Sequence, residues 1–294
     1  MMNNRVNYLS IDVEDYFHVS AFERISPPEG WRNKELRVEI NTDKVLSILS
    51  ANSVKATFFV LGWVAERCPD LVKRIASEDH EIASHGFGHQ RVYNQSRDGF
   101  RNDIRRSKQF LEDLTGQPVF GYRAPSYSIS KETFWAFDEL CEAGYLYDSS
   151  IFPIHHDLYG ISDWPRFAAP VVKVSGGFWQ TGKKANGQTS IMEVPISTVQ
   201  IAGKNFPIAG GGYFRLFPYE LTRLGLQRIN RNEGQNFVFY LHPWELDPDQ
   251  PRMHGAGWKS RFRHYLNLHK TEERFWRLLS DFRFGTISRG LQLN

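Results

Sequence analysis

The stretch LSIDVEDYFHV, residues 9–19, joins an apolar run to three closely spaced carboxylates. The apolar run predicts a buried β-strand that ends at Asp12, Glu14 and Asp15. Acids crowded at the end of a strand repel one another and cost stability unless something compensates. A divalent cation would turn this repulsion into attraction, so the stretch raises the possibility of a metal site.

Short apolar strands alternate with amphipathic helices in the first half of the chain. The pattern there predicts strands at 7–12, 55–62, 81–86 and 119–128, and helices at 42–53, 69–80, 96–116 and 130–145. In the second half, a helix is predicted at 218–231 and a strand at 236–244. Thr42 is the expected N-cap of the first helix, and Gly116 is expected to end the third. This alternation predicts an α/β fold with a parallel sheet covered by helices.

The rest of the chain is less regular. Residues 157–212 are rich in Gly, Pro and short β-like runs, and we expect an irregular β-rich insertion there. Residues 247–270 are expected to form an irregular basic loop, followed by a helix at 271–282 and a strand at 284–288. We expect residues 1–294 to form one domain, with 245–294 as a C-terminal extension packed on it.

Composition excludes several classes of function. Apolar residues make up 41% of the 294 residues, enough for a buried core, and the formal net charge is only +3. The basic residues are scattered, which argues against a nucleic-acid partner. Cys68 and Cys141 are far apart in sequence, so a reducing compartment is expected. With no signal-like or membrane-spanning apolar stretch, the sequence predicts a soluble, cytoplasmic protein, and it leaves the oligomeric state open.

Polar side chains follow several of the predicted strands. They are Asp12, Glu14, Asp15, His85, His89, Arg123, Asp148 and His242. Because the carboxyl ends of parallel strands meet at one edge of a sheet or barrel, we expect these side chains to share one rim.

Two imidazoles and a carboxylate form a common catalytic metal site. His85 and His89 supply the imidazoles, and Asp12 and Glu14 point to the same side of an extended strand, so that one acid can bind the metal while the other serves as a general base. Asp15 would point away and has two open roles, as a metal ligand or as a helix cap or ion-pair partner.

Two further rim residues have expected roles in catalysis. Arg123 would orient the carboxylate base. His242 would donate a proton to a leaving group, with Asp148 holding its other nitrogen.

Six segments in this order resemble the polysaccharide deacetylase family (carbohydrate esterase family 4, the NodB homology domain). They are SIDVED, ATFFVLG, SHGFGH, YRAPSYS, YDSSIFP and FYLHP, within residues 6–245. The chain most resembles the subgroup that has DVEDYFH near its start and an appended C-terminal region, which is associated with bacterial exopolysaccharide or PEP-CTERM/exosortase loci.

The resemblance implies a distorted (β/α) barrel with fewer than eight strands, a divalent metal, most often zinc, and removal of N-acetyl groups from amino sugars of a polysaccharide or oligosaccharide. It implies that Asp12 is the base, Arg123 its partner, and His242 the acid, tuned by Asp148. It further implies that His85 and His89 bind the metal, and a backbone N–H of residues 123–127 would stabilise the oxyanion. Ser126, Tyr127 and Trp244 are expected to contact substrate.

One departure from the family pattern concerns the first motif. Many members have two adjacent aspartates, whereas Val13 here separates Asp12 from Glu14 and Asp15. Glu14 is the preferred metal ligand and Asp15 the alternative. Two other functions stay open, namely hydrolysis of a small ureide or a lipid-linked formamido sugar, and glycan binding without catalysis.

Overall fold

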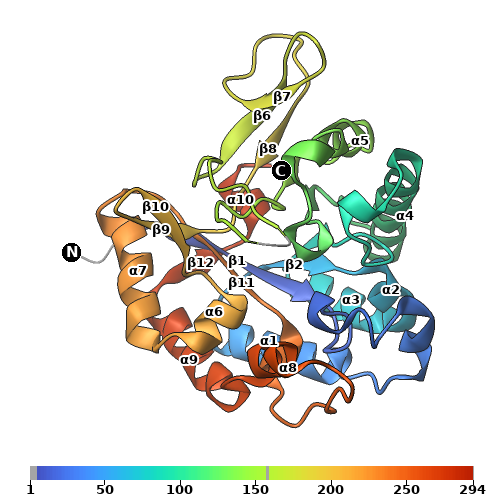
Figure 1. The fold of residues 1–294 in the computed structure, drawn as a ribbon, viewed down its shortest axis with the longest axis vertical. Helices are drawn as coiled ribbons and strands as arrows, with labels where there is room; N and C mark the ends of the chain where they lie inside the picture. The colour runs from blue at the N-terminus through green and yellow to red at the C-terminus, as the bar shows by residue number, and fades with distance from the viewer. Residues whose placement is uncertain (1–4, 157–158, 294) are drawn as a thin grey trace.

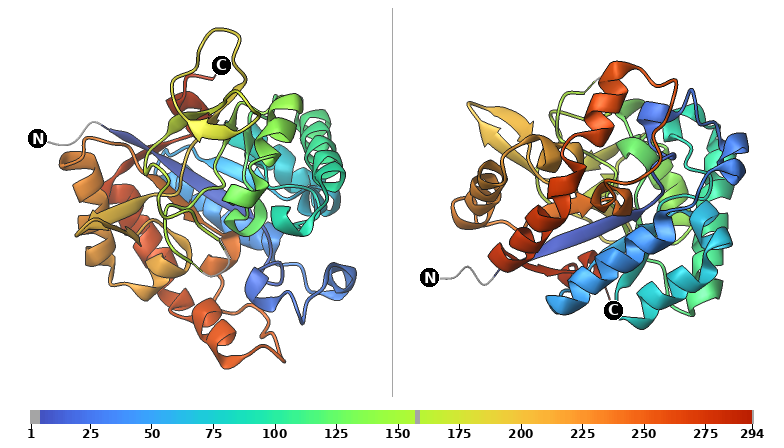
Figure 2. Two further views of the ribbon diagram at one scale, coloured as in Figure 1. Left: turned by 45° about the horizontal axis from the view of Figure 1, so that its top comes forward. Right: turned by 90° about the horizontal axis from the view of Figure 1, so that it is seen from below.

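A mostly parallel β-sheet forms the centre of the molecule, and helices surround it (Figures 1 and 2). The computed structural model describes residues 5–156 and 159–293. Within them the strand order is β11-β1-β2-β3-β4-β5-β8-β6-β7, with β12 beside β1. All neighbours from β11 to β8 pair in parallel, which gives seven consecutive parallel strands. The predicted α/β class is confirmed.

The sheet strands are β1 (Val6–Val13), β2 (Thr57–Val60), β3 (Glu81–Ser84), β4 (Gly121–Tyr122), β5 (Tyr147–Asp148), β6 (Ala169–Lys173), β7 (Trp179–Thr181), β8 (Ser190–Glu193), β11 (Val238–Leu241) and β12 (Arg283–Gly285). A separate hairpin is made by β9 (Thr198–Ile201) and β10 (Lys204–Pro207). The α-helices are α1 (Val38–Ala51), α2 (Gly62–Arg67), α3 (Pro69–Ser77), α4 (Arg97–Thr115), α5 (Ala136–Glu142), α6 (Gly211–Leu216), α7 (Tyr219–Arg231), α8 (Trp258–Tyr265), α9 (Leu268–Asp281) and α10 (Ile287–Gly290). Short 3-10 turns are η1 (Ser20–Phe22), η2 (Pro28–Asn33), η3 (Val92–Asn94), η4 (Pro125–Tyr127), η5 (Lys131–Thr133) and η6 (Pro243–Leu246).

Side-chain alternation in β1 explains how the sheet divides the core. Leu9, Ile11 and Val13 pack into the large apolar cluster that includes residues of the covering helices. Tyr8 lies in a second cluster on the other face of the sheet. Since successive strand residues point to opposite faces, Asp12 shares the face of Tyr8. The Asp12 side chain is thereby directed away from the helix-packed core.

The first helix begins earlier than the sequence predicts. Helix α1 starts at Val38, and Thr42 lies inside it, where its hydroxyl donates to the Val38 carbonyl at 2.6 Å. The N-terminal N–H groups of this helix are satisfied by a distant carboxylate, that of Asp15, instead of by a local cap. The prediction that Gly116 ends α4 is confirmed, since Gly116 is its left-handed C-cap.

One prediction for the C-terminal region is wrong, and a second is correct only in part. Residues 247–270 contain α8 and the start of α9 and are not one irregular loop. The spacing of Trp258, Phe262 and Tyr265 is helical, but only His264 of α8 is buried, so the basic composition concealed the helix. The closing strand expected at 284–288 is present as β12, but it ends at Gly285, and the short helix α10 follows from Ile287. The β-rich character of 157–212 is seen in β6 to β10, although residues 157–158 lie outside the described part.

The glycines at 210 and 211 allow α6 to start against β11. A Cβ on Gly210 would lie 2.0 Å from the Tyr240 carbonyl oxygen, and one on Gly211 would lie 2.3 Å from the Tyr240 hydroxyl. Both residues also have positive φ, at 110° and 53°. Only glycine meets both conditions, so this segment is a close-approach site and not a plain hairpin.

A buried carboxyl pair joins the two halves of the sheet. Asp148 of β5 lies directly opposite Glu193 of β8, and both are buried. Burial raises the pKa of both groups, and the charge of Asp148 raises that of Glu193 further. The pair therefore holds a proton at pH values where two exposed carboxyl groups would have lost it.

This pair predicts a pH-dependent stability. A raised carboxyl pKa means that the folded state binds more protons than the unfolded state, so its contribution is full below the ordinary carboxyl range and is lost as pH rises. Glu193→Gln supplies a permanent donor to Asp148. Between about pH 5 and pH 8, the melting temperature of this variant should fall less than that of the parent protein, by about 2–4 °C.

Thermal melts followed by circular dichroism at several pH values measure this difference. Glu29→Gln, at an exposed position, is the matched control and should melt like the parent protein. Equal pH slopes for Glu193→Gln and the parent protein would contradict the shared proton.

Candidate metal centre and catalytic site

A pocket of about 160 Å³ lies at the carboxyl ends of the central strands. Its lining includes Asp12, Glu14, His85, His89, Ser126, Tyr127 and His242. The structure thus brings together residues that are up to 230 positions apart in the sequence, 242 minus 12. Of the predicted site residues, Arg123, Asp148 and Trp244 do not line this pocket.

Arg123 holds Asp12 in place. Its guanidinium is fully buried, and Nη1 donates to Asp12 Oδ1 at 2.5 Å and to Ser10 Oγ at 2.9 Å. The other nitrogens donate to the Ser149 carbonyl and hydroxyl, at 3.1 Å and 2.9 Å. Burial works against the charged guanidinium, but the charge and hydrogen bond of Asp12 together with the nearby Tyr127 and Tyr147 outweigh it, so the pKa of Arg123 is raised. The arrangement agrees with the predicted orienting partner of a carboxylate.

Glu14, His85 and His89 can hold a metal ion. Their candidate ligand atoms all lie within 4.8 Å of one another. Glu14 Oε2 lies 2.6 Å from His89 Nε2, and both side chains are largely shielded from solvent. Burial would raise the pKa of Glu14, but His89 and the other nearby histidines outweigh it, so the pKa is lowered and the carboxylate stays charged. Two imidazoles and a carboxylate fit a divalent cation such as zinc.

A hydrogen bond from Nδ1 of His85 leaves its Nε2 free to bind a metal. Nδ1 donates to the Arg123 carbonyl oxygen at 2.8 Å, since a carbonyl can only accept. The lone pair therefore lies on Nε2. Burial lowers the pKa of His85 to about 4, so the ring is neutral near pH 7.

The turn between the two histidines is built by α4. Asp103 accepts the Phe87 and Gly88 backbone N–H groups at 2.8 Å and 3.0 Å. Gly86 has a φ of 73°, and a Cβ there would lie 2.9 Å from the Asp103 carboxylate. His89 itself has a positive φ of 53°. These constraints bend the chain so that both imidazoles reach one point.

Asp15 caps a helix and does not face the metal site. Its Oδ2 accepts the backbone N–H groups of Arg37 and Val38 at 2.7 Å and 2.9 Å, at the start of α1. Its Oδ1 accepts from Tyr16 N–H at 2.9 Å. Both oxygens are therefore engaged away from the histidines, and the geometry favours Glu14 as the acid that would bind a metal.

The partner of His242 is Glu245 and not Asp148, which corrects the sequence prediction. His242 Nδ1 lies 2.6 Å from Glu245 Oε1, and its Nε2 lies 3.3 Å from Glu14 Oε1 and 3.9 Å from Asp12 Oδ2. Asp148 instead accepts from Ser150 and faces Glu193 beneath the site. Burial lowers the pKa of His242, but the Glu245 hydrogen bond and the charge of Glu14 outweigh it and raise the pKa to about 9.

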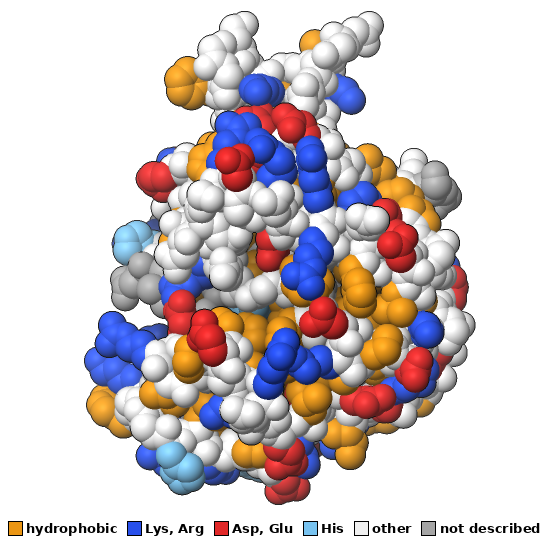
Figure 3. Space-filling view, turned by 90° about the vertical axis from the view of Figure 1, so that its right-hand side faces the viewer, with side chains coloured by type: hydrophobic (Ala, Val, Ile, Leu, Met, Phe, Trp, Pro, Cys, Tyr) orange, Lys and Arg blue, Asp and Glu red, His pale blue; other side chains and the backbone are white. Residues whose placement is uncertain are grey.

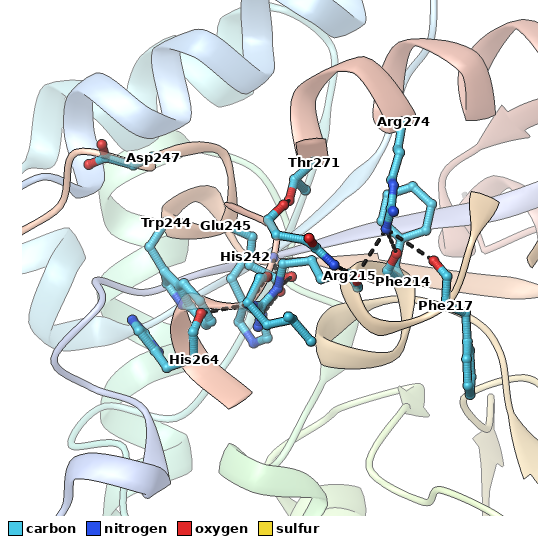
Figure 4. A network of polar contacts seen from close by, with 12 residues as sticks. Phe214, Arg215, Phe217, His242, Trp244, Glu245, Asp247, His264, Thr271 and Arg274 are labelled. Carbon is cyan, nitrogen blue, oxygen red and sulfur yellow. Dashed lines mark hydrogen bonds and ion pairs between the residues drawn. The ribbon is translucent and has the colours of Figure 1, made fainter. Parts of the chain in front are cut away.

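Glu245 belongs to a buried network that sequence reasoning missed (Figure 4). Arg215 Nε donates to Glu245 Oε2 at 2.9 Å, and its Nη1 donates to the His264 and Leu266 carbonyls at 2.5 Å and 3.1 Å. The available signal for Glu245 was its position three residues after His242 on a Pro-initiated turn. Arg215 left no such signal, since only folding brings α6 to this rim.

Trp244 is expected to contact substrate, but it lies behind His242 and does not line the pocket. Only 4% of it is exposed, and its ring stacks on His242 and on His264, with centroids 5.2 Å and 4.3 Å apart. Ser126 and Tyr127 do line the pocket and have positive φ values of 56° and 53°. The backbone N–H groups of Arg123, Ala124 and Tyr127 are bonded within the protein. Since Pro125 has none, the Ser126 N–H is the candidate oxyanion donor in this loop.

Charges of both signs are mixed on one face of the molecule. On the face drawn in Figure 3, Lys and Arg side chains are interspersed with Asp and Glu, and apolar side chains lie between them. Among residues 5–156 and 159–293, no helix combines the length and apolar character that a membrane span requires.

These observations describe an α/β protein of the distorted-barrel type with a polar site on its rim. Residues 29–145 match the family model described as polysaccharide deacetylase, and residues 149–292 match one described as a domain of unknown function, DUF3473. Residues 29–145 are therefore a polysaccharide deacetylase segment, as the motifs indicate, and a DUF3473 region follows it.

Similar proteins agree with this assignment. Two peptidoglycan-N-acetylglucosamine deacetylases of Bacillus cereus are 37% identical over 99 residues and 36% identical over 104 residues. These alignments cover 33% and 35% of this chain, and only 36% and 47% of the relatives. A crystal structure from Mycobacterium smegmatis, described as a candidate polysaccharide deacetylase, superposes with a TM-score of 0.61 and 18% identity, over 98% of this chain and 91% of that one. That likeness confirms the predicted fold.

The different positions of Glu14 and Asp15 predict different effects of mutation. Glu14→Gln or His85→Ala should weaken zinc binding by more than the roughly 10–100-fold that loss of an outer partner costs. Asp15→Ala should bind zinc like the parent protein but lose about 2 kcal/mol of stability, because two helix N–H groups lose their acceptor. Equilibrium dialysis and chemical unfolding measure the two quantities. Normal zinc affinity in Glu14→Gln together with its loss in Asp15→Ala would contradict this assignment.

Proposed function

We propose that this protein is a divalent-metal-dependent N-deacetylase, with zinc as the preferred metal, acting on amino sugars of a bacterial exopolysaccharide or its precursor. The observation that carries the proposal is one shared pocket. In it, the Arg123-held Asp12 and the Glu245-held His242 lie beside the Glu14, His85 and His89 cluster. The polysaccharide deacetylase segment supports the reaction class.

The reaction adds water across the amide C–N bond and yields a free amine and acetate. When bound at the three-residue cluster, a divalent cation supplies Lewis acidity for the amide carbonyl and lowers the pKa of nearby water. Asp12 takes the proton from the attacking water, and Arg123 keeps its carboxylate oriented. As water adds to the carbonyl carbon, negative charge develops on the carbonyl oxygen, and the Ser126 backbone N–H donates a hydrogen bond to that oxygen.

His242 completes the reaction by protonating the departing nitrogen. Its pKa of about 9 keeps it charged near pH 7, as a general acid requires. Its Nε2 lies 3.9 Å from Asp12 Oδ2, so acid and base face the same small volume. Glu245 holds Nδ1, which directs the other proton toward the pocket.

We further propose that the whole chain acts as one catalytic unit. Asp12 and Glu14 precede both family matches, His85 and Arg123 lie in the first, and His242 lies in the second. A complete site would therefore need both segments, which are also joined by the ion pair between Arg37 and Asp247 at 2.9 Å.

Acetate release from the N-acetylglucosamine tetramer tests the function. Zinc-loaded protein should release acetate, and Asp12→Asn should lower kcat about 10²–10⁴-fold while keeping zinc and fold, because an amide cannot accept the proton. Asp113→Asn, an exposed carboxylate-to-amide change, is the matched control. If zinc-loaded, folded protein is inert on acetylated and formylated sugars and on small ureides, the proposal fails.

Glu245→Gln separates the His242 partner from general structural support. The variant keeps an oxygen for Nδ1 but removes the charge that favours the imidazolium, so kcat should fall about tenfold or more while KM changes little. Glu273→Gln on the exposed side of α9 should leave both constants unchanged. A tenfold rise in KM with an unchanged kcat in Glu245→Gln would contradict the role assigned to Glu245.

A further inference from the structure

A groove of about 560 Å³ adjoins the catalytic pocket, and most of its lining residues come from α6 and α8. Figure 1 shows where these two helices lie. Tyr159 and Tyr240 line both cavities, so they form a shared wall. One extended ligand can therefore occupy both. Neither the proposed reaction nor the buried network uses this groove.

Exposed aromatic side chains dominate the groove. Trp258 is 74% exposed and Phe262 is 55% exposed, on one side of α8, and Tyr213 lies on the opposite wall. Trp258 is the most exposed large apolar side chain in the described part of the chain. Leaving such surface in water is unfavourable unless it serves binding.

Positive charge accompanies the aromatic rings. Lys259 and Arg263 line the groove, and Lys259 Nζ lies 5.7 Å from the centre of the Trp258 ring. None of the described lining residues carries a carboxylate. The groove is therefore complementary to a ligand with an apolar face and a negative charge.

The Gly-rich segment keeps the groove open. Gly212 lines it, and a Cβ there would have only one neighbour, Arg215 Nη2 at 3.9 Å. Any larger side chain at this position would extend into free space beside Tyr213. Gly210 and Gly211 pack directly against Tyr240, whereas the space beside Gly212 is open.

We infer that this groove is a subsite for an acidic sugar residue next to the amino sugar that is deacetylated. The inference rests on the proposed function and extends it to the substrate class, a glycan that carries uronic acid. Sugar rings pack on Trp258 and Tyr213, and the carboxylate pairs with Lys259 and Arg263. The phenol and indole groups can hydrogen-bond to sugar hydroxyls, whereas a lipid chain would offer them no partner.

Isothermal titration of metal-free full-length protein tests the subsite without requiring turnover. The acidic probe is the tetrasaccharide of alternating glucuronic acid and N-acetylglucosamine, and the neutral probe is the N-acetylglucosamine tetramer. We expect the acidic probe to bind about tenfold more tightly at roughly 20 mM salt and to lose most of this advantage at roughly 200 mM.

Two variants assign the effect to the groove. Lys259→Ala with Arg263→Ala should abolish the preference for the acidic probe, and Trp258→Ala should weaken both probes. Lys183→Ala with Lys184→Ala removes the same charge from the loop between β7 and β8 and should change nothing.

Three outcomes would overturn the inference. These are equal affinity for the two probes, an unchanged preference in the double variant at the groove, or binding of phosphatidylglycerol vesicles through Trp258 and Lys259 in place of either sugar. Since the titration needs no catalysis, absence of acetate release would contradict the proposed function alone.

Discussion

The buried ion pair between Arg123 and Asp12 is the interaction on which the rest of the site depends. A guanidinium with no exposed surface is costly unless its nitrogens are satisfied, and Ser10, Asp12 and Ser149 provide that satisfaction. The same residue supplies the backbone oxygen that fixes His85. Through its side chain and its backbone carbonyl, Arg123 thus connects Asp12 on β1 with His85, which follows β3. The pair also explains why the strand-end acids can be crowded, since each has a different partner.

The sequence predicted the rim because period-2 alternation and strand order are local properties with a known spatial consequence. Asp12, Glu14, His85, His89, Arg123 and His242 follow parallel strands, and parallel strands end at one edge. Within a strand, the same alternation distinguished Glu14 from Asp15. The sequence could not predict the surroundings of Asp15, because its carboxylate accepts hydrogen bonds from the start of α1, more than 20 residues later.

Contacts between distant segments account for the errors. Asp148 is expected beside His242 because both follow predicted strands, but β5 places Asp148 opposite Glu193. Glu245 takes that position from a turn just three residues away, supported by Arg215 from α6. The family resemblance implies that Trp244 contacts substrate, yet its ring stacks on His242 outside the pocket. The helix α8 was hidden since its apolar residues are exposed, a pattern that core-based reasoning discounts.

The central claim is that the crowded acids have separate roles, with Glu14 binding metal and Asp12 free to act as the base. Crystals of zinc-loaded protein, measured at the zinc absorption edge, test this most directly. The account predicts one anomalous peak within bonding distance of Glu14, His85 and His89, with Asp12 held by Arg123. A zinc ion bound by Asp15, or the absence of any zinc at this pocket in crystals soaked at saturating concentration, would contradict it.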